Sequence, residues 1–169
     1  MAPNHSTTAE QHLTHPDSAT TRDDGLVIVA ESGVGPYGQR ITTGRHVLVA
    51  DEPEPAGADS GPDPYRLLLS ALGACTSMTV RMYAERKSWP LEHVTVSLRH
   101  ERVPVADRTE GGPGDHITRE IRLTGDLSPE QRQRLIDIAE KCPVHRTLTS
   151  PTHITTTSAP EHRHDEPHP

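Results

Sequence analysis

Two cysteines are the residues of this chain whose types most readily do chemistry. Cys75 lies inside the apolar stretch PYRLLLSALGACTSMTV, and Cys142 opens the stretch CPVHRTL. A thiolate is a nucleophile, and its pKa falls beside cations or the free N–H groups at the start of a helix. Because Cys142 precedes Pro143, it can cap a short new turn that holds His145. The negative C-terminal end of the helix that Cys142 finishes would act in the opposite direction, so the sequence leaves the balance open.

Three alternatives compete with a nucleophilic role of the cysteines: inert packing, a zinc site, and a hydrolase that uses other residues. Free cysteine is often buried and behaves as a small hydrophobe. Cys142 and His145 have the spacing of one zinc-ligand pair, which Cys75, His46 and His100 could complete. Structural zinc sites usually take ligands as two close pairs, and only one is visible, so we predict no metal and no cofactor. The chain lacks G-x-S-x-G, which argues against a serine hydrolase of that type.

Composition indicates one domain between two polar arms. Of the 169 residues, 31% are hydrophobic, and both ends are rich in Ser, Thr, Pro, His and acidic residues. We therefore expect disordered arms at 1–24 and 159–169 and one domain at 25–158. The net charge of −7, without a run of Lys or Arg, argues against nucleic acid or an anionic membrane as partner.

The expected location is the cytoplasm. No stretch approaches the roughly 18 apolar residues of a membrane span, and the first residues lack the pattern of a secretory signal. The cytoplasm keeps thiols reduced, so a cysteine pair there is more often redox-active or metal-binding than structural.

The first part of the domain has the pattern of a β-hairpin. Two β-branched runs, 25–33 and 39–52, flank a Gly/Pro turn cluster. Gly44, inside the second run, predicts a β-bulge. Asp51 and Glu52 are interpreted as solvated turn residues.

A long helix should follow and carry the first cysteine. Asp63 is a good N-cap, Pro64 suits the first helical position, and the helix should end near Lys87 or Ser88. Its first half is apolar on every side, which predicts a central helix that other elements enclose. One expected face consists of Leu68, Leu72, Cys75, Thr79 and Met82.

The second half of the domain should add two strands, a helix and a last strand. Alternation predicts strands at 93–105 and 116–125. Ser128 and Gln131 form a capping box that opens a helix, and a short strand is expected at 151–157. The predicted order is β-β-α-β-β-α-β, an α+β fold. The inner face of the second helix should hold Leu135, Ile138, Ala139 and Cys142.

Four motifs together resemble the OsmC/Ohr family. These are ADEP, PYRLLLSALGACTSMTVRMYA around the first cysteine, GDLSPEQRQRL, and AEKCPVHRTL around the second. The resemblance spans about residues 26–157 and is nearest to the OsmC-like branch. It implies curved antiparallel sheets around two central helices and an intertwined homodimer.

The resemblance also implies thiol-dependent reduction of organic hydroperoxides. Cys75 would attack the peroxide and become a sulfenic acid, Cys142 would resolve it as a disulfide, and a dithiol reductant would restore both. Peroxidase members of the family carry a Glu after the proline at the start of the central helix, where this chain has Tyr65, so the expected hydroperoxide reductase is weak or specialised. They also carry an Arg on the hairpin, which here offers Arg40 and Arg45. Arg40 is the candidate taken, and His145 is a candidate substitute base or cation. The alternative from another class is a binding or sensing protein for a small apolar or electrophilic molecule.

Overall fold

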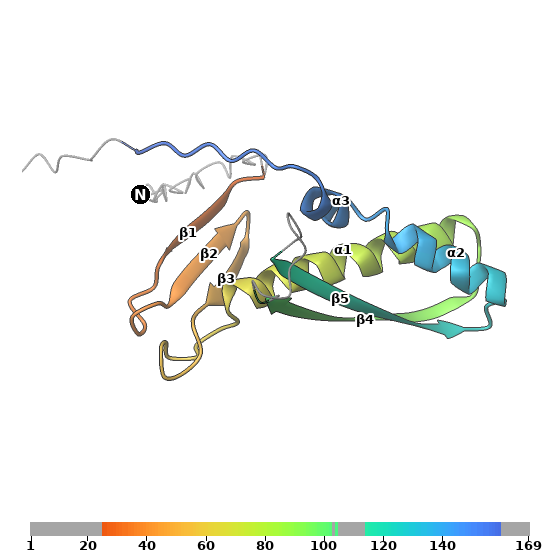
Figure 1. Ribbon diagram of the computed structural model, residues 1–169, viewed down its shortest axis with the longest axis horizontal. Helices are drawn as coiled ribbons and strands as arrows, with labels where there is room; N and C mark the ends of the chain where they lie inside the picture. The colour runs from red at the N-terminus through yellow and green to blue at the C-terminus, as the bar shows by residue number, and fades with distance from the viewer. Residues whose placement is uncertain (1–24, 103, 105–113, 160–169) are drawn as a thin grey trace, which may run out of the picture.

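A computed structural model describes residues 25–102, 104 and 114–159. The predicted arm at 1–24, nearly all of the arm at 159–169 and the last residues of the predicted strand 93–105 lie outside the described residues. The fold is α+β with antiparallel sheets, as predicted (Figure 1). Its elements in chain order are β1 (Val27–Glu31), β2 (Gln39–Thr43), β3 (His46–Ala50), α1 (Pro64–Arg86), β4 (Leu91–Arg102), β5 (Asp115–Gly125), α2 (Pro129–Ala139) and α3 (Pro143–Thr149).

The N-terminal sheet has three strands rather than the two predicted. The strands pair in the order β1-β2-β3, and Thr43 opposite His46 leaves Gly44 and Arg45 as a two-residue turn. Gly44 has a φ of +52°, which favours glycine and suits tight hairpin turns. The predicted bulge at Gly44 is therefore wrong, because the glycine reverses the chain instead of kinking a continuous strand.

The loop after β3 is organised by a buried carboxylate. Asp51 is 2% exposed, and it accepts hydrogen bonds from the backbone N–H groups of Glu52, Ala58 and Ser60 and from Ser60 Oγ. The N–H of Ser60 is the largest cause that lowers the pKa of Asp51, and the other donors outweigh the opposing effect of burial. The interpretation of Asp51 as a solvated turn residue is therefore wrong.

Helix α1 begins and ends close to the predicted positions. Asp63 caps it by accepting from the backbone N–H of Arg66 at 2.8 Å, Pro64 opens it, and Lys87 is the C-cap. The expectation that no stretch approaches a membrane span is wrong by length and hydropathy, because α1 passes that test among the described helices, as core helices also do. It contacts β4, α2 and α3, as a core helix does.

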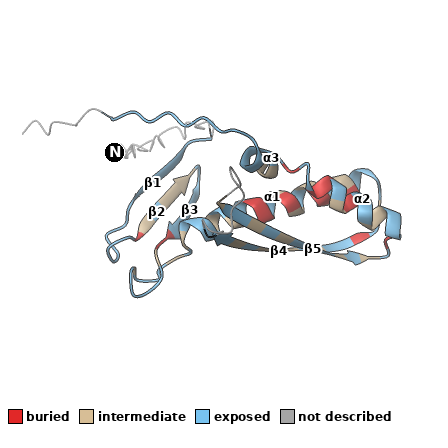
Figure 2. Cartoon of the chain, viewed as in Figure 1, coloured by how far each residue is buried: buried red, intermediate tan, exposed pale blue. Residues whose placement is uncertain are grey.

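The buried face of α1 differs from the predicted one. Met82 is 59% exposed and Leu68 37% exposed, although the apolar pattern placed both on an enclosed face. The β4–β5 ribbon and α2 cover one side of the helix and leave other faces open in the single chain (Figure 2). The buried residues of α1 are Leu72, Gly73, Thr76, Val80 and Ala84.

The second half of the fold holds the core. Strands β4 and β5 form an antiparallel ribbon, and α2 opens with the predicted capping box of Ser128 and Gln131. The predicted inner face of α2 is buried, with Leu135 and Cys142 fully enclosed. The core cluster consists of Val80, Ala84, Leu91, Leu127, Leu135 and Ala139.

The end of the described chain differs from the prediction. Residues 151–157 form no strand, and Ile154 is 82% exposed. Helix α3 stands where only a short turn was expected. β-Branched residues favour an extended backbone, but a strand also needs a hydrogen-bonding neighbour, and none pairs with this segment in the described structure.

Candidate active site

The two cysteines meet where α1 passes the corner between α2 and α3. Cys75 lies in the middle of α1 and is partly exposed, whereas Cys142 is the N-cap of α3 and is fully buried. Both are free thiols, and they lie near enough for each to shift the pKa of the other. The fold therefore joins two residues that are 67 positions apart in the sequence (142 − 75).

Polar groups near the Cys142 thiol outweigh the effect of its burial on the pKa. Burial raises its pKa, but the Cys75 thiol, the N–H groups of His145 and Val144 and the Thr76 hydroxyl together lower the pKa below the ordinary value. The sequence left open whether the end of α2, which would raise the pKa of Cys142, or the start of α3, which would lower it, has the larger effect. The N–H groups at the start of α3 are among the causes that lower the pKa.

The pKa of Cys75 is shifted in the opposite direction, above its ordinary value. Burial raises its pKa, and so does donation of its proton to the Cys142 sulfur. The Val144 N–H and the Thr79 hydroxyl act in the lowering direction without reversing the shift. In the singly ionised pair, the negative charge therefore resides mainly on the buried Cys142, while the more accessible sulfur is that of Cys75.

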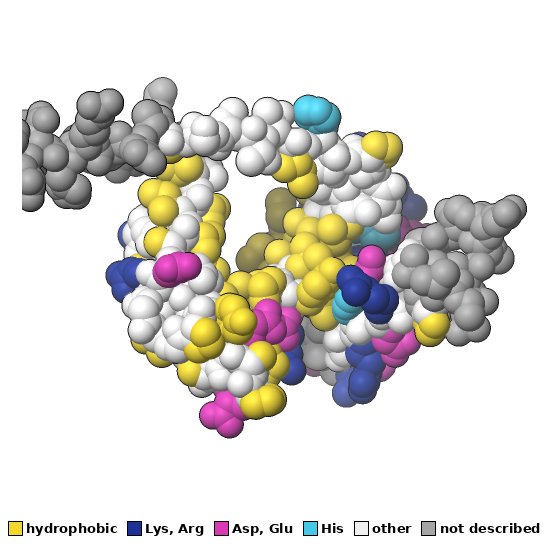
Figure 3. Space-filling model, turned by 60° about the vertical axis from the view of Figure 1, so that its left-hand side comes forward, with side chains coloured by type: hydrophobic (Ala, Val, Ile, Leu, Met, Phe, Trp, Pro, Cys, Tyr) yellow, Lys and Arg dark blue, Asp and Glu magenta, His cyan; other side chains and the backbone are white. Residues whose placement is uncertain are grey.

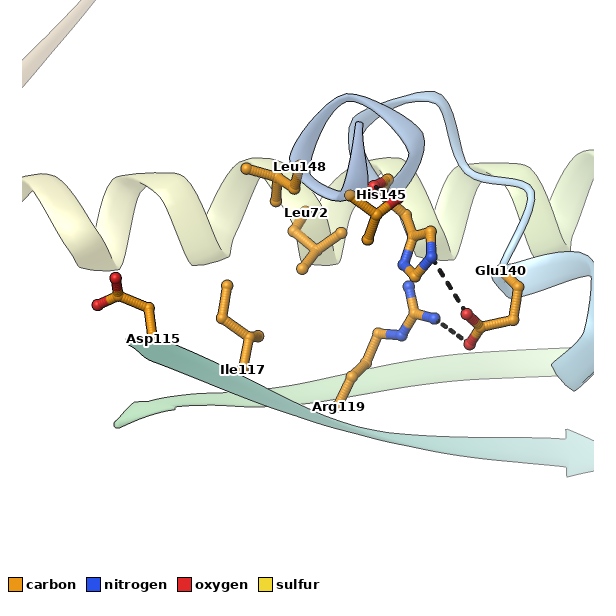
Figure 4. Close-up of a pocket in the computed structure, with 8 residues that line it drawn as sticks. Leu72, Asp115, Ile117, Arg119, Glu140, His145 and Leu148 are labelled. Carbon is orange, nitrogen blue, oxygen red and sulfur yellow. Dashed lines mark hydrogen bonds and ion pairs between the residues drawn. The ribbon is translucent and has the colours of Figure 1, made fainter. Parts of the chain in front are cut away.

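A cavity of about 600 Å³ is lined by residues from α1, β5, the end of α2 and α3, among them Leu72 and His145, which lie three positions from Cys75 and Cys142 in the sequence (Figure 4). Leu72, one helical turn before Cys75, and Leu148 face Ile117 of β5 across an aliphatic middle part (Figure 4). Arg119, Glu140 and His145 lie on one side of this part and Asp115 on the other. The residues that line it are Leu72, Asp115, Ile117, Arg119, Glu140, His145, Leu148 and Thr149.

The polar end of the cavity is a network centred on Arg119. The guanidinium donates to Glu140 Oε1 at 2.6 Å, to Thr76 Oγ1 at 2.9 Å and to the Ala139 carbonyl at 3.4 Å. Glu140 also pairs with His145 Nε2 at 3.2 Å. The network thus joins β5, the end of α2, α3 and the helix that carries Cys75 (Figure 4).

The other predicted site residues lie in different places. The His145 side chain is directed to Glu140, and only its backbone N–H faces the Cys142 sulfur. Arg40 is exposed on β2, whose main contacts are with β1 and β3, so this chain does not bring it to the cysteines. Tyr65, which stands where the resemblance calls for a Glu, stacks on the His100 ring at 4.3 Å.

The zinc ligand set considered from the sequence is not assembled. Among the described residues, no group of three or more His, Cys, Asp or Glu side chains could hold a metal ion. His145 is paired with Glu140, and His100 Nε2 lies 2.9 Å from Asp115 Oδ1.

Sequence reasoning missed three residues of the site, namely Thr76, Arg119 and Glu140. One signal could have pointed to Arg119. It occupies the inward-facing phase of β5, between Ile117 and Ile121, and a charged residue on an apolar stripe needs a specific partner.

Comparison with known proteins decides the family. A family model described as OsmC-like protein matches residues 57–157. The chain belongs to the OsmC-like family. A search of curated proteins found no match.

Solved structures of OsmC-like proteins have the same fold. An OsmC-like protein of Mycoplasma pneumoniae is 21% identical, with a TM-score of 0.58 over 73% of this chain and 84% of that one. An organic hydroperoxide resistance protein OsmC of Legionella pneumophila, also described as a predicted redox protein, is 20% identical, with a TM-score of 0.54 over 73% and 88%. A putative organic hydroperoxide resistance protein of Vibrio cholerae, with captopril in one of its active sites, is 17% identical, with a TM-score of 0.53 over 77% and 88%.

Proposed function

We propose that this OsmC-like protein reduces organic hydroperoxides with Cys75 and Cys142. The observation that carries the proposal is the pair of neighbouring free thiols, one partly exposed with a raised pKa and the other buried with a lowered pKa. Two of the structural neighbours are described as organic hydroperoxide resistance proteins, which supports the same chemistry.

The shared proton of the pair gives each cysteine a role. The Cys142 thiolate takes the proton of Cys75, and the Cys75 sulfur attacks the peroxide, breaking the O–O bond. Cys75 becomes a sulfenic acid, and the leaving alkoxide takes the proton from Cys142 to give the alcohol. The Cys142 thiolate then attacks the sulfenic sulfur, which forms the disulfide and releases hydroxide, protonated to water. An external dithiol returns both cysteines to thiols by exchange.

The cavity supports an organic rather than an inorganic peroxide. Its aliphatic part, formed by Leu72, Ile117 and Leu148, suits an alkyl or aryl group, and it begins one turn from Cys75. Apolar walls with a few polar groups are typical of small-molecule sites.

We also propose that the protein works as a homodimer in the cytoplasm. The sheet β1–β3 and the open side of α1 carry exposed apolar side chains, and these border the hollow between the sheet and the helices (Figure 3). Exposed apolar surfaces of this kind mark interaction sites, and a second copy with the same surfaces can cover them. The exposed side chains include Val27, Ile28, Val29, Val47, Leu48, Val49, Met78 and Met82.

A binding or sensing protein is the second candidate, and the raised pKa of Cys75 favours it, since a protonated thiol attacks slowly. The two candidates differ in turnover. A reductase cycles through a disulfide, whereas a sensor or binding protein is modified once or holds its ligand without chemistry.

Intact mass and free-thiol counting after one equivalent of cumene hydroperoxide test the proposal. Wild type should rapidly lose two hydrogen atoms and both thiols, Cys142→Ser should accumulate a sulfenic acid, and Cys75→Ser should keep its remaining thiol. Dithiothreitol should restore wild type for repeated cycles. Unchanged thiols in wild type after long exposure would refute the reductase.

A further inference from the structure

Burial of the charged Arg119 side chain is unfavourable, which suggests a role beyond packing. Its side chain is only 10% exposed and sits between Ile117 and Ile121 on the inward face of β5. Withdrawing a guanidinium from water is unfavourable unless its donors are paired. The partners are the carboxylate of Glu140 and two groups near the thiol pair, the Thr76 hydroxyl and the Ala139 carbonyl.

Thr76 links this cation to the sulfur. A hydroxyl has one proton to donate and two lone pairs. Because Thr76 Oγ1 accepts from Arg119 Nη1 at 2.9 Å, its own proton is directed away from the guanidinium. The group near this hydroxyl is the Cys142 thiol, whose pKa it lowers, and both residues are fully buried. Ser70, on the same helix, shows the usual alternative, since its hydroxyl donates to the Arg66 carbonyl one turn earlier.

We infer that Arg119 is a positioning residue of the thiol pair, which fixes the Thr76 hydroxyl as a donor to Cys142 and so stabilises the thiolate that receives the Cys75 proton. The inference rests on the proposed function for its catalytic meaning. Polarisation by the cation strengthens the hydroxyl as a donor, because linked hydrogen bonds reinforce one another in a low-dielectric interior.

Glu140 holds Arg119 in place rather than acting on sulfur. Its two carboxylate oxygens are divided between Arg119 Nη2 and His145 Nε2. The charged groups around the pair thus come from β5, the end of α2 and α3. Lys141 and Arg146, the other cations near Cys142 in the sequence, are exposed to water.

Ultraviolet titration of the thiolate in the full-length reduced protein tests the inference. Arg119→Met and Thr76→Val should each raise the first apparent pKa of the pair by about one unit, a tenfold lower thiolate fraction at neutral pH. Thr76→Ser keeps the hydroxyl and should titrate like wild type. Arg122→Met is the matched control, because Arg122 lies on the same strand, is 77% exposed and pairs with Glu120; it should leave the titration unchanged.

The double variant tells positioning from a direct effect of charge. If Arg119 acts through Thr76, Arg119→Met should add almost nothing in the Thr76→Val background. An equal rise in both backgrounds would overturn the inference, and so would an unchanged titration in a folded Arg119→Met. If Arg119→Met does not fold, the comparison of Thr76→Val with Thr76→Ser decides, and identical titrations refute the role of the hydroxyl.

The titration uses no peroxide, so the two proposals fail separately. Thiols that resist cumene hydroperoxide but titrate as expected would refute the reductase and leave the Arg119–Thr76 arrangement standing. A working peroxidase cycle with an unaltered titration in Arg119→Met would refute only the arrangement.

Discussion

Oxidation of the thiol pair should make the protein measurably more stable. The two thiols lie near enough to shift each other's pKa, so we expect a disulfide to form without large movement of α1 or α3, and it would close a loop of 67 positions (142 − 75). The chain-entropy estimate for a loop of this length is about 4 kcal/mol. For a chain of this size, that corresponds to a rise in Tm on the order of 10 °C.

Urea unfolding of the fully reduced and peroxide-oxidised protein measures this difference. Cys75→Ser and Cys142→Ser, carried through the same oxidation, should show no change in midpoint. The mass of the oxidised wild type must be that of a single chain, because a link between chains would also raise stability. An oxidised form that is equally or less stable than the reduced form would refute the reasoning, since it would mean that α1 and α3 must separate to join the sulfurs.

Three further predictions follow from packing and charge. Leu135→Ala should lower the free energy of unfolding in urea by about 3 kcal/mol, because Leu135 is fully buried beside small residues that cannot fill the space. Ile154→Ala, at an 82% exposed position, should lower it by less than about 0.5 kcal/mol. Because the pKa of Asp51 is lowered in the folded protein, its carboxylate contributes to the free energy of unfolding above the unfolded pKa, and this contribution is lost as pH falls below about 4. Asp51→Asn should have a smaller free energy of unfolding at neutral pH and lose this pH dependence, whereas Asp59→Asn should keep it. An unchanged pH dependence in Asp51→Asn would contradict the assignment. The double variant Met78→Glu/Met82→Glu should convert a dimer to monomers in analytical ultracentrifugation, whereas the control Ile154→Glu should not. A wild type that sediments as a monomer would exclude the dimer.

Local signals in the sequence predicted most of the elements. The caps at Asp63 and Ser128 and the prolines that follow them placed the starts of α1 and α2 correctly, because these signals act within one helical turn. The buried face of α2 was also predicted. The strand expected at 151–157 was wrong, because a strand depends on a neighbour that no local pattern reveals.

The candidate site was predicted only in part. Cys75 and Cys142 were singled out, and the structure brings them together. The relay through Thr76 depends on β5 lying across α1 so that Arg119 reaches over the helix, a contact between residues 43 positions apart. Spacing in the sequence carries no information about such a crossing, whereas a charged residue in the inward phase of an apolar strand does indicate that a buried partner exists.

The exposed face of α1 connects the fold to the proposed assembly. Apolar residues at helical spacing predicted a helix enclosed on all sides, yet Leu68, Met78 and Met82 remain exposed in the single chain. The β1–β3 sheet has the same property, with apolar side chains that none of the described helices covers extensively. In the proposed dimer, hydrophobic periodicity would report burial in the assembly rather than in one isolated chain. Two unpartnered apolar surfaces on one chain, a sheet and a helix, are what an exchange of sheets between two copies would bury. Arg40 lies on β2, whose main contacts are with β1 and β3, so in the proposed dimer the same exchange would offer it a route to the cysteines of a second copy.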